Sequence, residues 1–120
     1  MSYDVYLVDA VTGSTLELPE VHNIAGGIRL LNGTSECWLN VTYNYSRFFY
    51  DNFPKDTGLR WLYGKTGQDS LPVLESIIAK LIPDEGGYDY WASTEGNARR
   101  ALEGLLVFAK AHPNGVWKGD

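Results

Sequence analysis

Hydrophobic and polar residues alternate along residues 36–50, "ECWLNVTYNYSRFFY". One parity of this segment is apolar and consists of Cys37, Leu39, Val41, Tyr43 and Tyr45. The other parity carries an indole, side-chain amides and a hydroxyl, and consists of Glu36, Trp38, Asn40, Thr42 and Asn44. A period of two predicts a β-strand with one buried face. We expect this strand, over residues 37–43, to be the central strand of a sheet.

The first third of the chain predicts further short strands. Residues 3–8 alternate in the same way, and the turn residues 12–14, Thr-Gly-Ser, separate them from a second short run that ends at Leu18. We expect these two segments to form a β-hairpin. A glycine pair, Gly26-Gly27, and an Asn-Gly turn bracket residues 28–31, which predict another short strand.

From Ser46 onward the period becomes helical. Ser46 is the expected N-cap of a first helix that buries Phe49 and Phe53 and ends at Pro54. A further helical turn within residues 56–63 is expected to end at Gly64, in a C-terminal cap position.

Residues 69–83 give the clearest prediction of a helix, with one apolar stripe. Asp69 or Ser70 is the expected cap, Pro72 is expected in the first turn, and Pro83 ends the helix. The inward-facing residues of this stripe are Leu71, Leu74, Ile77, Ile78 and Leu81.

Thr94 is the expected cap of a last helix, whose apolar residues recur at helical spacing. These inward-facing residues are Ala98, Ala101, Leu102, Leu105, Phe108 and Ala109. Residues 113–115, Pro-Asn-Gly, then turn the chain. Because a large apolar indole is costly to leave exposed, we expect Trp117 to pack onto the body of the protein or a neighbouring subunit. The alternative is that Trp117 is an exposed anchor for a partner. Lys118 and Asp120 are expected to remain in water.

Runs of strands precede runs of helices, which favours an α+β fold over an alternating parallel sheet. We therefore predict a small, mostly antiparallel N-terminal sheet of three or four strands, packed against about three C-terminal helices. The length of 120 residues fits one domain, spanning residues 1–120.

Composition narrows the class of protein. The formal net charge is −5, which argues against general coating of nucleic acid, although bases are concentrated between residues 37 and 80. The single Cys37 excludes an internal disulfide and a cysteine-based zinc site. The first residues do not resemble a signal peptide, and no stretch is long enough to cross a bilayer. We therefore expect a cytoplasmic protein without a membrane segment.

The familiar catalytic motifs are incomplete. Residues 64–66, Gly-Lys-Thr, resemble the end of a phosphate-binding loop, but the spacing to the preceding Gly58 is wrong and no strand leads into them. His22 and His112 lack neighbours at metal-ligand spacing. The carboxylates of residues 84, 85 and 89 fit a solvated acidic loop. We predict no cofactor, metal or catalytic residue, although a triad assembled in space stays open as a small-hydrolase alternative.

Two groups of residues could bind a ligand or a partner. The first is the polar row Trp38, Asn40, Thr42 and Asn44, whose amides and indole suit a nucleobase, a sugar or a peptide edge. The second is the set of central bases Arg47, Arg60 and Lys65, which alternate with aromatic residues. Each group also has a structural alternative: helices cover the polar row, and the rings between the bases belong to the core.

Four segments of the chain carry a resemblance to a known group of proteins. They are "WLNVTYNYSRFFY", "GLRWLYGKTGQDSLPVLESIIAKL", "YWASTEGNARRALEGLL" and "PNGVWKGD". Together they resemble short uncharacterised proteins encoded by bacteriophages and prophages, over most of the chain. The resemblance implies a phage setting, and it brings no assigned reaction or catalytic residue.

This setting favours an accessory, non-enzymatic binding protein. We expect it to bind a host or phage protein, as an anti-CRISPR-like inhibitor of host defence does. The alternative from a different class is capture of a nucleotide-like signal molecule by the polar row and the central bases. Self-association into a homo-oligomer is compatible with either expectation.

Overall fold

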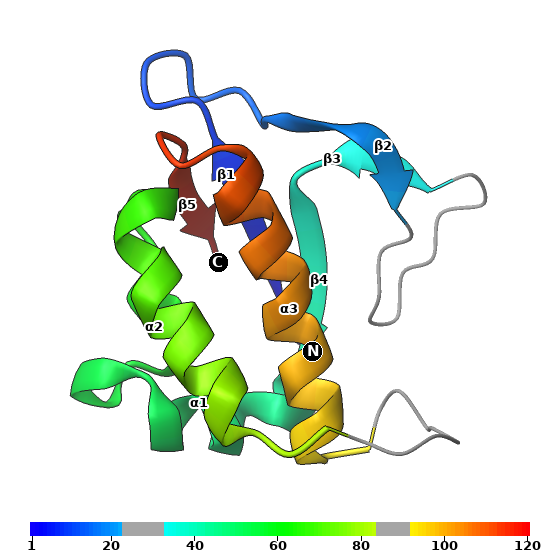
Figure 1. Cartoon of the computed structure of the whole chain (residues 1–120), viewed down its shortest axis with the longest axis vertical. Helices are drawn as coiled ribbons and strands as arrows, with labels where there is room; N and C mark the ends of the chain where they lie inside the picture. Colours follow the sequence, from blue (N-terminus) through cyan, green and yellow to red (C-terminus); the bar gives the residue numbers. More distant parts are fainter. Residues whose placement is uncertain (23–32, 84–91) are drawn as a thin grey trace.

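The computed structural model describes residues 1–22, 33–83 and 92–120 (Figure 1). Its strands are β1 (Ser2–Val8), β2 (Glu17–His22), β3 (Thr34–Glu36), β4 (Trp38–Thr42) and β5 (Val116–Gly119). Its helices are α1 (Ser46–Asn52), α2 (Gly67–Lys80) and α3 (Glu95–Ala111), with 3₁₀ turns η1 (Tyr43–Tyr45), η2 (Pro54–Asp56) and η3 (Gly58–Leu62). The protein is therefore α+β, as predicted. The strand predicted at residues 28–31 and the acidic residues Asp84, Glu85 and Asp89 lie outside the described residues.

β1 is the central strand of a three-stranded antiparallel sheet with the order β4-β1-β5. The prediction that residues 37–43 form the central strand was wrong, because β4 lies at an edge of this described sheet. The other side of β1 pairs with β5, where Trp117 lies opposite Leu7. The sheet therefore joins the first and last described segments of the chain and is not purely N-terminal.

The predicted hairpin between β1 and the segment that follows it is reduced to a single bridge. Val8 pairs with Thr15, and the Leu16 amide donates to the Leu7 carbonyl at 3.0 Å. β2 then leaves β1 and pairs with β3 in a separate two-stranded sheet. The physical reason is that a strand has only two edges, and β4 and β5 already occupy both edges of β1.

α2 and α3 lie side by side on one face of the three-stranded sheet (Figure 1). α3 packs on β4, since Gly104 faces the side chain of Leu39. The residues predicted to face inward from α3 are all buried, and Thr94 caps the helix by accepting a hydrogen bond from the Asn97 amide at 3.1 Å. Both predictions are confirmed.

α2 begins earlier than expected. Its N-cap is Thr66, whose hydroxyl accepts from the Asp69 amide at 3.1 Å, so neither Asp69 nor Ser70 caps the helix. Pro72 therefore lies beyond the first turn. Gly67 permits this early start, because a Cβ there would lie 2.7 Å from the main-chain oxygen of His112. The helix can approach the end of α3 closely only where the side chain is absent.

Ser46 is the first residue of α1 and not its N-cap, which is Tyr45. The turn η1 leads directly into α1, and the Thr42 hydroxyl caps that turn instead, by accepting from the Asn44 amide. Ser46 is left to hydrogen-bond the Tyr3 hydroxyl at 2.8 Å. Gly64 follows η3 with a φ of 89°, as its predicted role in a C-terminal cap requires.

Trp117 is fully buried, which confirms that the tail packs onto the body of the protein. Its indole Nε1–H donates to Ser70 Oγ at 2.9 Å, and its main chain pairs with Gly64 and Lys65. Lys118 and Asp120 are exposed, as expected. β5 therefore ties the beginning of α2 to the central strand.

Candidate functional site

The candidate site lies on the face of the three-stranded sheet opposite α2 and α3, which we call the outer face. No described helix covers it (Figure 1). Strand register places Tyr6 beside Trp38 on one side and Lys118 on the other. The rings of Tyr6 and Trp38 are stacked, with centroids 5.8 Å apart and planes 9° apart. Both rings are half-buried, so one part of each supports the sheet and another part meets solvent.

Asp4 organises the polar groups of the outer face. Its Oδ1 accepts hydrogen bonds from Trp38 Nε1 at 3.2 Å and from Asn40 Nδ2 at 2.9 Å. The Asn40 amide also donates to Ser2 Oγ at 2.8 Å, and its side chain is only 3% exposed. The Asp4 amide donates to Asp120 Oδ1 at 3.0 Å. The network fixes the orientation of the indole on the sheet.

The electrostatic environment of the stacked pair is acidic. Partial burial raises the pKa of the Tyr6 phenol, and the charges of Asp4, Asp120 and Glu36 raise it further. These are three carboxylates against the one base, Lys118, that shares the row. An aromatic surface with neighbouring carboxylates attracts cations, because the ring faces carry partial negative charge and the carboxylates carry full negative charge.

The four residues of the predicted polar row do not all lie on one exposed surface. Trp38 and Asn40 lie on the outer face, as the alternation predicted. Thr42 is buried, and its hydroxyl accepts from the main chain of η1. Asn44 is exposed within η1, beyond the end of β4. The row is divided because the strand ends at Thr42 and the chain turns.

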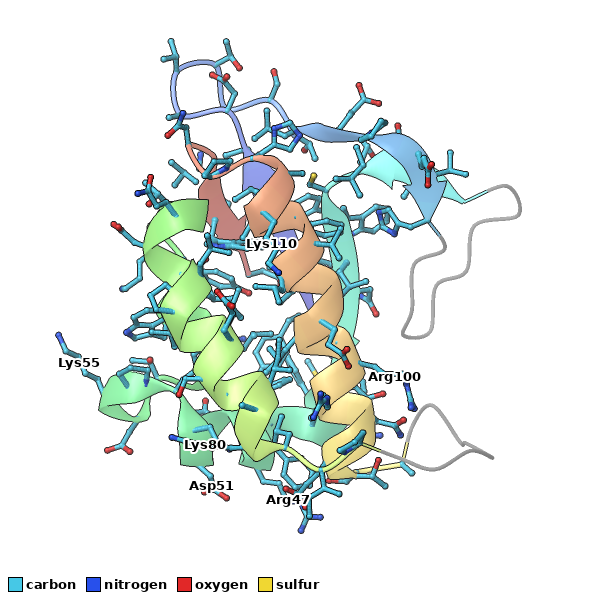
Figure 2. The ribbon with its side chains drawn as sticks, viewed as in Figure 1. Arg47, Asp51, Lys55, Lys80, Arg100 and Lys110 are labelled. Carbon is cyan, nitrogen blue, oxygen red and sulfur yellow. The ribbon has the colours of Figure 1, made fainter. Side chains whose placement is uncertain are left out.

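The three predicted bases are held by different partners. Arg47 extends from α1 at one end of the molecule, donates to the Ser93 carbonyl at 3.0 Å and stacks on the Phe48 ring (Figure 2). The Lys65 ammonium lies 4.3 Å from the centre of the Trp61 ring. Arg60 donates through Nη2 to the Tyr43 hydroxyl at 3.1 Å. These separate contacts give no support to one combined site for the three cations.

Arg60 also lines a cavity of about 230 Å³ that the sequence did not predict. The other residues that line it are Tyr3, Tyr43, Ser46 and Tyr50. They come from β1, η1 and α1, so only the three-dimensional fold brings them together. Asp4 and Tyr6 of the outer face were missed as well, although the alternation of β1 was the signal that could have found them.

A second, larger groove of about 420 Å³ lies between the turn after β1 and the turn before β5. Its ionisable groups already have partners. The Asp9 carboxylate accepts from the amides of Thr12 and Val11 at 2.9 Å each, and these bonds lower the pKa of Asp9. His112 Nε2 bonds the Glu17 carbonyl at 2.6 Å. Its polar lining is therefore engaged in holding the turns.

In the described part of the chain, the histidine rings hydrogen-bond main-chain carbonyls and the cysteine thiol is buried. His22 Nε2 bonds the Glu36 carbonyl at 2.7 Å, and within residues 1–22, 33–83 and 92–120 no serine hydroxyl is hydrogen-bonded to a histidine ring. Burial raises the pKa of the Cys37 thiol to about 11, which keeps it protonated. The same residues hold no metal-binding group of three or more His, Cys, Asp and Glu side chains.

No helix among the described residues is long and apolar enough to cross a membrane. Comparisons with protein-family models, with curated protein sequences and with solved structures found no match. Function is therefore inferred from the chemistry of the outer face.

Proposed function

We propose that this protein is a non-enzymatic binding protein whose outer face receives a basic segment of a partner protein. The observation that carries the proposal is the stacked pair of Tyr6 and Trp38 beside the carboxylates of Asp4, Glu36 and Asp120. Rings fixed on a sheet lose little conformational entropy on binding, and indole and phenol groups are favoured at protein interfaces.

The chemistry of this surface selects a cationic partner. An arginine or lysine side chain placed over the Trp38 ring would gain a cation–π interaction and the attraction of the nearby carboxylates. Lys118 limits this preference to the side of the row nearer β4, because a second cation beside it would be repelled. The expected partner surface is therefore a few basic side chains, of the kind that line nucleic-acid-binding grooves.

The resemblance to phage-encoded proteins supplies the proposed setting. There, the partner is a host protein in the host cytoplasm, and the bound protein acts as an anti-defence inhibitor by occupying a basic groove. Self-association stays a prediction that light scattering tests directly. Nucleotide capture by the polar row with Arg47, Arg60 and Lys65 also stays a prediction, as does the hydrolase alternative.

Binding of a labelled Arg/Lys-rich peptide, followed by fluorescence anisotropy, tests the proposal. We expect Trp38→Ala and Glu36→Lys each to weaken binding by about tenfold, or about 1.4 kcal/mol. Glu75→Lys is the matched control, since Glu75 is exposed on α2, away from the outer face. Binding should also weaken as salt is raised.

Two results would overturn the proposal. One is a wild-type protein that binds the basic peptide no better than an acidic peptide of equal length. The other is equal weakening by Glu36→Lys and Glu75→Lys, which would show that net charge alone drives the interaction. Circular dichroism of each variant checks that the fold is retained.

A further inference from the structure

The cavity beside Arg60 lies outside the proposed protein-binding surface, and its chemistry differs. Its lining combines one guanidinium, three phenol rings and the hydroxyl of Ser46. The volume of about 230 Å³ is smaller than the roughly 300–1,000 Å³ of pockets that enclose drug-sized ligands. The cavity therefore suits one small polar group of a ligand whose remainder lies in solvent.

Arg60 is held in a defined orientation. Its Nε–H donates to the main-chain oxygen of Asp120 at 3.2 Å, and Nη2 donates to the Tyr43 hydroxyl at 3.1 Å. The guanidinium carbon lies 4.9 Å from the centre of the Tyr3 ring and 5.8 Å from that of Tyr43. A cation fixed by two hydrogen bonds and two rings is organised before any ligand arrives.

The charge of Arg60 is not neutralised by a carboxylate side chain. The ion pair found among residues 1–22, 33–83 and 92–120 joins Arg99 to Glu103, and Arg60 takes no part in it. A guanidinium has five N–H donors, and two of those of Arg60 donate to described residues, so three make no hydrogen bond within the described part of the chain. The side chain of Asp120, whose main-chain oxygen accepts from Arg60, accepts from the Asp4 amide.

Hydroxyl groups supply the remaining recognition. Tyr50 is 45% exposed, and its hydroxyl has no hydrogen-bond partner among the described residues. The hydroxyls of Tyr3 and Ser46 bond to each other at 2.8 Å, so together they retain the capacity to donate one further hydrogen bond. An arginine fork with neighbouring hydroxyl donors is the donor set that a tetrahedral oxyanion requires.

We propose that this cavity binds the phosphoryl group of a small phosphate monoester, with Arg60 as the charged ligand and Tyr50 as a hydroxyl donor. The rest of the molecule extends past Tyr50 into solvent. The Tyr50 ring packs closely over Gly58, since a Cβ on Gly58 would lie 3.2 Å from it. The site is separate from the outer face, and its test needs no protein partner.

Titration with inorganic phosphate and with ribose 5-phosphate, followed by NMR of the Arg60 side-chain Nε–H, tests the site. We expect saturable shifts and tighter binding of the ester, which can also contact Tyr50. Arg60→Gln should weaken binding by at least about tenfold, whereas the control Lys110→Gln, which removes the same charge, should leave it unchanged, because Lys110 is exposed on α3 and does not line the cavity.

Tyr50→Phe keeps the proposal testable if Arg60→Gln does not fold, because it removes one hydroxyl and no described hydrogen bond. We expect it to weaken phosphate binding about threefold, the loss of one exposed hydrogen bond. The phosphate ester should bind more weakly below about pH 6, where its dianion takes up a proton. The binding of sulfate, which takes up no proton in this range, should stay constant. A phosphotyrosine peptide that binds while both small phosphates fail would overturn the assignment to a small ester. Equal losses in the Arg60 and Lys110 variants would overturn the site itself.

Discussion

Replacing Trp117 by alanine should be among the most destabilising single changes in this chain. The side chain is 0% exposed, and its strand, β5, pairs with the edge of β1 that β4 does not occupy. Truncating a buried tryptophan costs about 3–5 kcal/mol, from lost burial and from the cavity that remains. The net stability of a domain is about 5–15 kcal/mol, so this one change removes a large share of it.

The hydrogen bond from the indole to Ser70 gives a second, smaller expectation. Trp117→Phe keeps most of the ring but removes the donor, and should cost about 1–2 kcal/mol. Ser70→Ala leaves the indole N–H buried without a partner, and should cost about 1–3 kcal/mol. The order of the three variants therefore separates the contribution of packing from that of the hydrogen bond.

Urea unfolding followed by far-UV circular dichroism measures these differences without relying on the tryptophan signal. A loss of 3–5 kcal/mol corresponds to a fall in Tm of about 10–20 °C for a chain of this size. Trp38→Ala is the matched control: its ring is half-buried on the opposite face of the same sheet, and it should lose only about 1 kcal/mol. A Trp117→Ala variant within 1 kcal/mol of the wild type would refute the burial of the tail.

Two further predictions concern backbone contact and pH. Gly67→Ala should destabilise the fold by about 1–3 kcal/mol, because its Cβ would lie 2.7 Å from the main-chain oxygen of His112. Gly104→Ala is the control, because its Cβ would lie at an ordinary 3.4 Å from Leu39. Equal effects of the two changes would show that the close approach at Gly67 is not the cause of the loss. Burial raises the pKa of Cys37 from 9.0 to about 11, so the unfolded state loses this proton first as pH rises. The free energy of unfolding should therefore fall by about 2–3 kcal/mol between about pH 9 and 11, and Cys37→Ala should lack that component of the slope.

Local patterns in the sequence predicted the elements whose signals are local. The cap at Thr94 and the stripe of α3 follow from hydroxyl chemistry and a period of 3.6, which need no knowledge of the rest of the chain. The burial of Trp117 followed from the cost of exposing an indole. The order of the strands did not follow, because β1 and β5 are separated by more than one hundred residues and both edges of β1 compete for partners.

The candidate sites show the same division. The alternation of β4 placed Trp38 on the outer face, but its partner Tyr6 could be identified only once the register of β1 was known. Arg60 was selected as a base among aromatic residues, yet the ring beneath its guanidinium belongs to Tyr3, at the opposite end of the sequence. Pairing across the sheet, and not spacing along the chain, decides which of the predicted residues meet.

The two proposed sites are separate, but Asp120 supports both of them. Its carboxylate accepts from the Asp4 amide on the outer face, while its main-chain oxygen accepts from Arg60 and from the Tyr63 hydroxyl. β5 is in turn held to the rest of the fold by Trp117, whose main chain pairs with residues 64 and 65. Because Arg60 and the Asp4 amide both donate hydrogen bonds to the residue that follows β5, a change that destabilises β5 disturbs both surfaces together. A change confined to Tyr50 or Glu36 affects one surface alone, so variants at these two residues separate the two proposals.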